Sequence, residues 1–173
     1  MNFDFSFEQL QIKDSASKLL AQRCPPAVVR RVLEGQEPYA GKLWSELGES
    51  GFLAAAIPQQ FGGIGAGPLE LCVIAEELGR ALAPVPFLSS IGLCAELIGR
   101  AASTTQQARW LPRLASGEGI GCLALVETTG RIAPEQISAR VTNGLLSGSK
   151  LAVLDGDIAD IAPVSYTHLT LPT

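Results

Sequence analysis

Apolar and polar residues recur with a helical period along the first two thirds of the chain, and capping signals mark where the periodic segments begin. The stretch "SFEQ" at residues 6–9 has the form of a capping box, in which the Ser6 hydroxyl accepts from the Gln9 amide and Gln9 reaches back. It predicts a helix running to about Gln22. The residues expected on its inward face are Leu10, Ala16, Leu19 and Leu20.

Three further helices are bounded by proline, serine and glycine signals. "PPAVVRRVLEG" begins with prolines and ends at Gly35, and "GKLWSELGESG" ends at Gly51. "STTQQARWLPRLASGE" opens with a second capping box, Ser103 with Gln106, and stops at glycine. Because Pro112 removes a backbone donor, we expect a kink or a restart there.

Two central helices are apolar almost all round. "LELCVIAEELGRA" and "FLSSIGLCAELIGRAA" leave only narrow polar stripes. The polar residues of these stripes are Glu70, Glu76, Glu77 and Arg80 in the first helix, and Ser89, Ser90 and Glu96 in the second. Helices of this kind belong in the middle of a bundle, so residues 1–118 are predicted to form a helical bundle.

The pattern changes after residue 118. "IGCLALV" (residues 120–126) has strand character, and Asn143-Gly144 separates two further candidate strands, a strong hairpin signal. "KLAVLDGD" predicts another strand with a turn at Asp155-Gly156. The fold class is therefore mainly α, then β: a helical bundle, followed over residues 119–164 by an antiparallel β domain with too few strands to be complete.

Composition excludes several classes of protein. The formal net charge is −4, from 13 basic and 17 acidic residues, which argues against nucleic acid as a partner. No stretch reaches the roughly 18 apolar residues of a membrane span, and the N-terminus lacks the features of a secretory signal. The four cysteines show no CxxC spacing, and three lie in apolar runs, which favours buried free thiols over metal ligands or disulfides and a cytoplasmic location.

The glycine-rich loop "FGGIGAGP" before the first apolar helix resembles a phosphate-binding loop only superficially. Gly63 and Gly65 fit a GxGxxG fingerprint, but the third position is Pro68 and no strand is expected before the loop. Glu70, in the first turn of the following helix, would repel a phosphate. The loop is predicted to connect two helices.

Together the motifs resemble the acyl-CoA dehydrogenase family. "LWSELGESGFLAAAIPQQFGGIGAGPLELCVIAEELGRA" is similar to that family's N-terminal helical domain, with its "IPxxxGG-G" loop and "EELGRA"-type helix. "QQARWLPRLASGEGIGCLALVE" and "NGLLSGSKLAVLDGDIADIAPV" resemble its next signature and the start of its middle β domain. The resemblance extends from residue 3 to about residue 164.

The resemblance implies FAD-dependent α,β-dehydrogenation of an acyl-CoA thioester, in a homo- or hetero-oligomer. In the family a glutamate of the C-terminal helical domain is the catalytic base, so no catalytic residue is expected in this chain. Carried over by position, Phe87 and Ser90 fall where the acyl pocket is lined. The residues that fall beside the flavin are Leu123, Leu125, Val126, Ala152 and Leu154.

Three of these positions depart from the family pattern. Val126 replaces a threonine that bonds the flavin pyrimidine edge, and Ala152 and Leu154 replace an aromatic residue and a Thr or Ser. "EPxxGSD" is replaced by "ETTGRIAP", which loses a serine. Either FAD is held differently here, or the chain is of the kind that serves as a non-catalytic partner subunit in heteromeric acyl-CoA dehydrogenases.

The last nine residues, "SYTHLTLPT" (165–173), match nothing in the family pattern and contain the only histidine, His168. They are predicted to be a non-native tail on a truncated chain that should not catalyse alone. A third hypothesis, a free-standing helical binding module, conflicts with the extent of apolar surface on the two central helices, which needs more neighbours than this chain provides.

Overall fold

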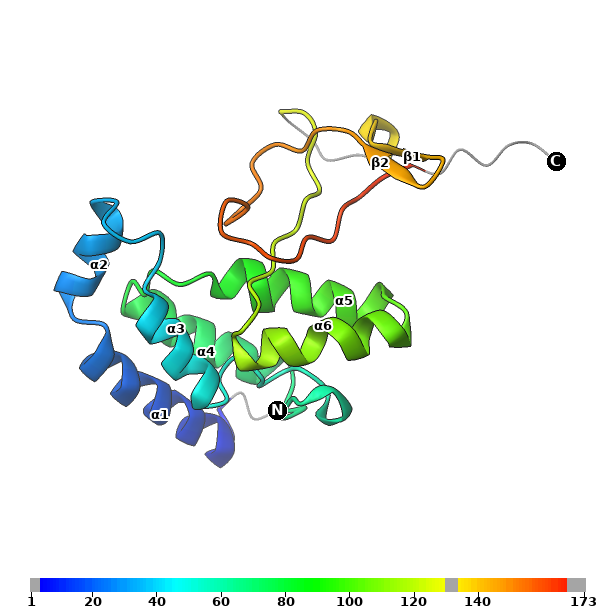
Figure 1. The fold of residues 1–173 in the computed structure, drawn as a ribbon. Helices are drawn as coiled ribbons and strands as arrows, with labels where there is room; N and C mark the ends of the chain where they lie inside the picture. The colour runs from blue at the N-terminus through cyan, green and yellow to red at the C-terminus, as the bar shows by residue number, and fades with distance from the viewer. Residues whose placement is uncertain (1–3, 130–133, 168–173) are drawn as a thin grey trace.

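In the described part of the chain, the α-helices all precede a small β unit (Figure 1). The computed structural model describes residues 4–129 and 134–167. The α-helices are α1 (Phe7–Arg23), α2 (Pro26–Leu33), α3 (Gly41–Glu49), α4 (Pro68–Arg80), α5 (Glu96–Ala101) and α6 (Thr104–Ser116). The other elements are the short 3₁₀ helices η1 (Gln59–Phe61) and η3 (Pro134–Gln136), the π-helical segment η2 (Leu88–Ala95), and strands β1 (Arg140–Thr142) and β2 (Leu145–Ser147). The predicted order, helices and then β structure, is confirmed.

Both predicted capping boxes are present. Ser6 accepts from the Gln9 amide at 3.2 Å, while the Gln9 side chain accepts from the Ser6 amide at 2.9 Å. Ser103 and Gln106 form the same reciprocal pair at the start of α6. α6 ends at Gly117, whose φ of +78° lies in the left-handed region that glycine adopts without strain. Local side-chain chemistry therefore set these helix ends.

The restart predicted as one outcome at Pro112 is wrong, because α6 runs through this residue to Ser116, while the kink stays a prediction. The amide that proline lacks would have bonded the carbonyl of Ala108. Ala108 and Pro112 are both exposed, so water can satisfy that carbonyl and the helix continues.

The inward face of α1 is narrower than predicted. Ala16 and Leu20 are buried, and Ile12 and Leu19 pack against them, whereas Leu10 is 50% exposed. Leu10 lies two positions before Ile12, about 200° around the helix, so it faces away from α4.

Two residues of α4 are also placed differently from the prediction. Glu77 was expected on the solvent-exposed polar stripe of its helix, but it is 3% exposed. It faces α1, where its Oε1 lies 3.8 Å from Lys13 Nζ. Cys72 lies in an apolar run but is exposed, since the buried face of α4 begins at the next residue, Val73. Cys94 and Cys122 are buried free thiols, as expected, and Cys24, which lies outside the apolar runs, is buried too.

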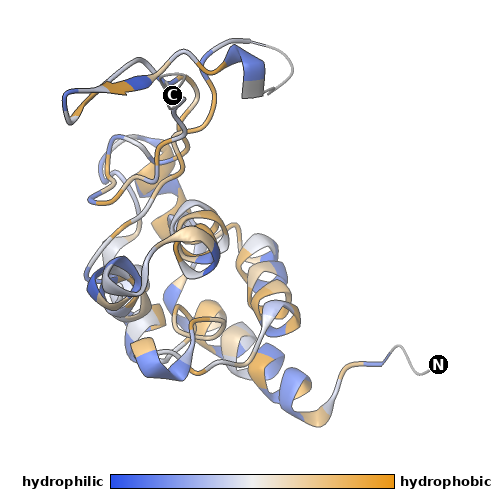
Figure 2. Ribbon diagram, turned by 90° about the vertical axis from the view of Figure 1, so that its right-hand side faces the viewer, coloured by the Kyte–Doolittle hydropathy of each residue, from blue (hydrophilic) through white to orange (hydrophobic). Residues whose placement is uncertain are grey.

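One hydrophobic core joins the helices (Figure 2). At its centre Trp44 and Leu47 of α3 pack with Leu53 and Leu114, and each is at most 2% exposed. The Trp44 indole N–H donates to the Gly117 carbonyl at 2.9 Å, so the one polar atom of this buried ring is satisfied. This bond ties α3 to the end of α6.

The glycine-rich loop connects α3 and α4 through η1, as predicted. Its amide groups bond inward: Ile64 donates to the Ala54 carbonyl and Gly65 to the Ile57 carbonyl, both at 2.9 Å. Gly63 lies so close to Ile57 that a Cβ at this position would stand 1.8 Å from its carbonyl oxygen. Gly63 therefore serves close backbone packing, Gly65 has a positive φ of +69°, and the amides of both donate within the protein.

The β unit contains the predicted hairpin but not the strand predicted for "KLAVLDGD". β1 and β2 pair antiparallel across Asn143-Gly144, whose φ angles are +51° and +76°. Residues 150–153 form no strand and residues 154–158 form a turn, since Ala152 and Asp155 both have positive φ. Residues 120–126, hereafter the strap, are extended and form two parallel bridges, Gly121 to Ile161 and Ala124 to Val164.

Among the residues that the structure describes, no helix combines the length and the apolar character that crossing a bilayer requires.

Candidate functional site

The residues predicted for the site lie on three segments that the fold brings together. Phe87 directly precedes η2 and Ser90 lies within it, while Leu123, Leu125 and Val126 belong to the strap. The Val126 carbonyl accepts from the Leu151 amide at 2.7 Å, which places the start of segment 151–154 beside the end of the strap.

The two wall residues are deeply buried. Phe87 is 5% exposed and Ser90 is fully buried. The Ser90 hydroxyl accepts from the Gly121 amide at 3.0 Å, so this residue links η2 directly to the strap. The predicted acyl-lining pair and the predicted flavin strap are therefore in contact.

The strap has one paired edge and one open edge. The amides of Cys122 and Ala124 donate to the carbonyls of Ile161 and Pro163, at 2.9 and 3.0 Å. The amides of Leu123 and Leu125 point to the other edge, since successive residues of an extended chain alternate. Among residues 4–129 and 134–167 these two amides have no hydrogen-bond partner. Both residues are half-buried, and a backbone N–H without a partner in the protein can donate to water or to a ligand.

At this edge the Leu125 carbonyl accepts from Lys150 Nζ and from Ser165 Oγ, at 3.3 and 3.0 Å. The three side chains that were predicted to face the flavin offer no polar contact. Val126 is half-buried, whereas Ala152 and Leu154 are exposed. None of the three carries a hydrogen-bonding group. Residues 130–133 of the departing motif "ETTGRIAP", and His168 with the rest of the tail to residue 173, lie outside the described residues.

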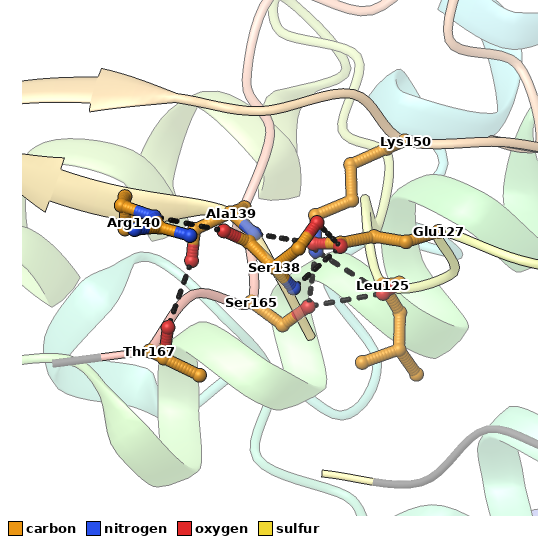
Figure 3. A network of polar contacts seen from close by, with 8 residues as sticks. All are labelled: Leu125, Glu127, Ser138, Ala139, Arg140, Lys150, Ser165 and Thr167. Atoms are coloured by element: carbon orange, nitrogen blue, oxygen red, sulfur yellow. Dashed lines mark hydrogen bonds and ion pairs between the residues drawn. The ribbon is translucent and has the colours of Figure 1, made fainter. Parts of the chain in front are cut away.

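A polar cluster, hereafter the clasp, joins the strap to the rest of the β unit (Figure 3). It consists of Glu127, Ser138, Lys150 and Ser165. Lys150 Nζ donates to Glu127 Oε1 and to Ser165 Oγ, each at 2.7 Å, and to the Leu125 carbonyl at 3.3 Å. The Glu127 carboxylate also accepts from the Ser138 amide and hydroxyl and from the Ala139 amide. The side chains of Glu127 and Lys150 are only 6% and 9% exposed.

The clasp holds Glu127 ionised. Hydrogen bonds from Lys150, then from the Ser138 hydroxyl and the Ser138 and Ala139 amides, lower the pKa of Glu127 to about 2. A carboxylate with so low a pKa is a poor proton acceptor near neutral pH, so Glu127 is unsuited to general-base catalysis. Its role is to fix the end of the strap.

A pH titration should expose this role. Because the pKa of Glu127 is lower in the folded chain than its ordinary value of 4.5, its stabilisation is complete above pH 4.5 and is lost as the pH falls toward 2. We expect the amide resonances of Ser138 and Ala139 to shift with a midpoint near pH 2. In Glu127→Gln this transition should be absent. A midpoint near 4.5 would show that the clasp does not hold the carboxylate.

Sequence reasoning did not identify the clasp or Asp155. The Ser89 hydroxyl donates to Asp155 Oδ2 at 2.5 Å, across 66 residues. The available signal was an acidic and a basic residue, Glu127 and Lys150, each beside an apolar run that was expected to form a strand. Opposite charges at such positions commonly meet across neighbouring strands.

Within the part of the chain that the structure describes, no cluster of His, Cys, Asp and Glu could hold a metal ion.

Comparison with known proteins agrees with this architecture. A family model for the acyl-CoA dehydrogenase N-terminal domain matches residues 6–118. The chain is 30% identical over 162 residues to mitochondrial isovaleryl-CoA dehydrogenase of Arabidopsis thaliana, which covers 90% of this chain and 40% of that protein. It is 35% identical over 119 residues to the acyl-CoA dehydrogenase IpdE2 of Mycobacterium tuberculosis, covering 68% of this chain and 36% of that protein.

Solved structures show the same likeness. The ChsE4–ChsE5 complex from Mycobacterium tuberculosis matches with a TM-score of 0.84 and 28% identity, over 96% of this chain and 45% of the matched chain. An acyl-CoA dehydrogenase complexed with FAD, from Bacillus anthracis, matches with a TM-score of 0.80 and 26% identity, over 94% and 29% of the two chains. The chain spans about 40% of the length of the curated relatives it matches. Since the family model covers more than half of it, the chain belongs to the acyl-CoA dehydrogenase family.

Proposed function

We propose that the chain forms the acyl-binding wall and the first flavin-binding strap of an FAD-dependent acyl-CoA dehydrogenase. The observation that supports it is the open edge of the strap. The amides of Leu123 and Leu125 have no partner among the described residues, and the strap that carries them is bonded to Ser90 through the Gly121 amide. A flat ring with hydrogen-bonding edges suits such an open backbone edge. FAD, when bound, would accept the hydride that leaves the acyl β-carbon.

The chain's own residues would then bind and exclude water. Phe87 and Ser90 would contribute to the wall of the acyl pocket, and Val126, Ala152 and Leu154 would face the flavin through apolar atoms. Excluding water from the space between them strengthens the polarisation of the thioester carbonyl. The backbone of the strap fits a flavin, whereas these three side chains add no hydrogen bond to it.

The 173 residues are not expected to dehydrogenate by themselves. Glu127 is locked in the clasp, and the carboxylate of Asp155 accepts from Ser89. We propose that the base that removes the α-proton comes from a further helical domain, as in the family. Residues 1–118 and 119–164 are then the helical domain and the start of the middle β domain. Ser165, which the sequence pattern assigned to a foreign tail, bonds Lys150 and the Ala124 carbonyl within the β unit.

A second function is favoured by the same three side chains. Because Val126, Ala152 and Leu154 lack polar groups, the chain could instead be a partner subunit that binds no flavin and completes a heteromeric enzyme. The similar ChsE4–ChsE5 structure is itself a complex of two proteins. The two functions differ in whether the strap, residues 120–126, can carry FAD.

A matched pair of chimeras tests the proposal. In one, residues 1–118 of this chain replace the corresponding part of the Arabidopsis isovaleryl-CoA dehydrogenase, and in the other residues 1–164 do so. Isovaleryl-CoA and butyryl-CoA are offered with an artificial electron acceptor. We expect both chimeras to oxidise acyl-CoA, with a substrate preference that changes on Phe87→Ala.

The outcomes separate the alternatives. If only the shorter chimera is active, the strap of this chain does not support flavin-dependent oxidation, and the partner-subunit function is favoured. If both chimeras fold, as judged by circular dichroism and gel filtration, and neither oxidises acyl-CoA, the helical domain does not form an acyl wall and the proposal is wrong.

A further inference from the structure

Two adjacent serines of η2 join the helical bundle to the β unit. Ser89 and Ser90 are both fully buried, an unusual position for hydroxyl groups, and each bonds a partner outside the bundle. The Ser90 hydroxyl accepts from the Gly121 amide at 3.0 Å, and the Ser89 hydroxyl donates to Asp155 Oδ2 at 2.5 Å. The second bond is charge-assisted, the stronger class of hydrogen bond.

The surroundings of this pair are tightly packed. A Cβ on Gly121 would stand 2.5 Å from Cys94 Sγ, so the strap touches η2 with no room for a side chain. Cys94 and Cys122 are 0% and 3% exposed. Burial, with a smaller contribution from Cys122, raises the pKa of Cys94 to about 12, as expected of a thiol held away from water. Breaking a hydrogen bond in a contact that excludes water lowers stability strongly, because it leaves a buried polar group without a partner.

The helix that carries the two serines is itself unusual. η2 is π-helical over eight residues, and π-helical turns recur at functional sites because they re-aim side chains. The Ser90 amide donates to the Pro86 carbonyl at 3.0 Å, which anchors the start of the segment. Both hydroxyls then face the β unit, whereas Leu88 and Leu93 stay 60% and 37% exposed.

We propose that the Ser89–Asp155 hydrogen bond, with Ser90–Gly121 beside it, is a latch that fixes the strap against η2 and so sets the gap between flavin edge and acyl wall. Asp155 is thus a positioning residue, acting through Ser89. That the gap separates a flavin from an acyl chain rests on the proposed function. The two hydrogen bonds, and their effect on the position of the strap, do not depend on that function.

The chain's own cysteines report on the latch. Cys94 and Cys122 lie beneath it, Cys24 is buried elsewhere, against the carbonyl of Ala81, and Cys72 is exposed. Purified chain is treated with iodoacetamide, and the modification of each cysteine is followed by mass spectrometry. In the unaltered chain Cys72 should react quickly and the three buried thiols slowly. Cys24 then serves as the internal control for general unfolding.

Three substitutions distinguish a latch from general packing. Ser89→Ala removes the donor. Asp155→Gly removes the acceptor and tolerates the φ of +55° at this position, and Asp155→Asn keeps an acceptor oxygen. We expect Ser89→Ala and Asp155→Gly each to speed modification of Cys94 and Cys122 by about tenfold or more, the size expected for a bond to a charged group. Cys24 should be unchanged. Asp155→Asn, which keeps an acceptor oxygen but loses the charge, should give labelling rates between those of the original chain and of Asp155→Gly.

Several results would overturn the latch. These are unchanged labelling of Cys94 and Cys122 in both disruptive variants, equal acceleration at Cys24, or an Asp155→Asn variant as labile as Asp155→Gly. Combining Ser89→Ala with Asp155→Gly should add little to either alone, and full additivity would contradict a direct bond. A failure of the chimeras to oxidise acyl-CoA would leave these labelling results as they are, so the two proposals fail separately.

Discussion

Replacing Trp44 with alanine should lower the free energy of unfolding by about 3–5 kcal/mol, the range for deleting a large buried aromatic side chain. Trp44 is 2% exposed at the centre of the core. Its indole N–H donates to the Gly117 carbonyl, so the substitution also frees a carbonyl at the end of α6. Since whole domains are stabilised by only about 5–15 kcal/mol, the variant should be close to unfolded at room temperature.

Urea denaturation followed by far-ultraviolet circular dichroism measures this change. Trp44→Phe is the matched control, because it keeps most of the buried ring and loses the hydrogen bond, and it should lose clearly less stability than the alanine variant. Trp110, half-buried on α6 beside Arg109 and Arg113, remains as a fluorescent reporter in both variants. A loss below about 1 kcal/mol for Trp44→Ala, within the range of ordinary surface changes, would show that α3 is not at the centre of the core.

The second large effect is expected at Gly121, where the strap crosses η2. A Cβ here would stand 2.5 Å from Cys94 Sγ, 2.6 Å from Cys94 Cβ and 3.3 Å from Leu114 Cδ2. Because these neighbours are buried, Gly121→Val must displace the strap, and overpacking of this kind lowers stability by about 1–3 kcal/mol. Thermal unfolding and the labelling rate of Cys122 should both report the displacement.

Gly99 supplies the control for this substitution. It lies in α5, and a Cβ at this position would meet no atom within 4 Å. Gly99→Ala should leave Cys122 protected and raise stability slightly, since alanine favours a helix by up to about 1 kcal/mol over glycine. If Gly121→Val is tolerated as well as Gly99→Ala, the contact between strap and η2 is looser than described.

Much of the fold could be predicted because its signals are local. Each capping box occupies four consecutive residues, and the hairpin is specified by Asn143-Gly144 alone. The glycine-rich loop was separated from a nucleotide-binding loop by Pro68 and Glu70, which lie within a few residues of it. The π-helical form of η2 has no such local signature, and Pro112 did not break α6 because the lost bond lies on an exposed face.

The candidate site was harder to predict because its contacts join distant residues. Ser89 and Asp155 are separated by 66 residues, and Lys150 and Glu127 by 23. Sequence placed Ser89 and Ser90 on a polar stripe, yet both are fully buried, because their partners come from the β unit. The family resemblance pointed to Leu123 and Leu125, but only the structure shows that their amides form an open edge.

The central claim, that the strap can carry a flavin through its backbone, is tested most directly by the absorbance spectrum of the chimera that contains residues 1–164. After purification with added FAD and gel filtration, we expect a stoichiometric flavin spectrum, as in the matched chimera with residues 1–118. A colourless, folded long chimera beside a yellow short one would contradict the claim, and would identify the strap with Val126, Ala152 and Leu154 as unable to hold FAD.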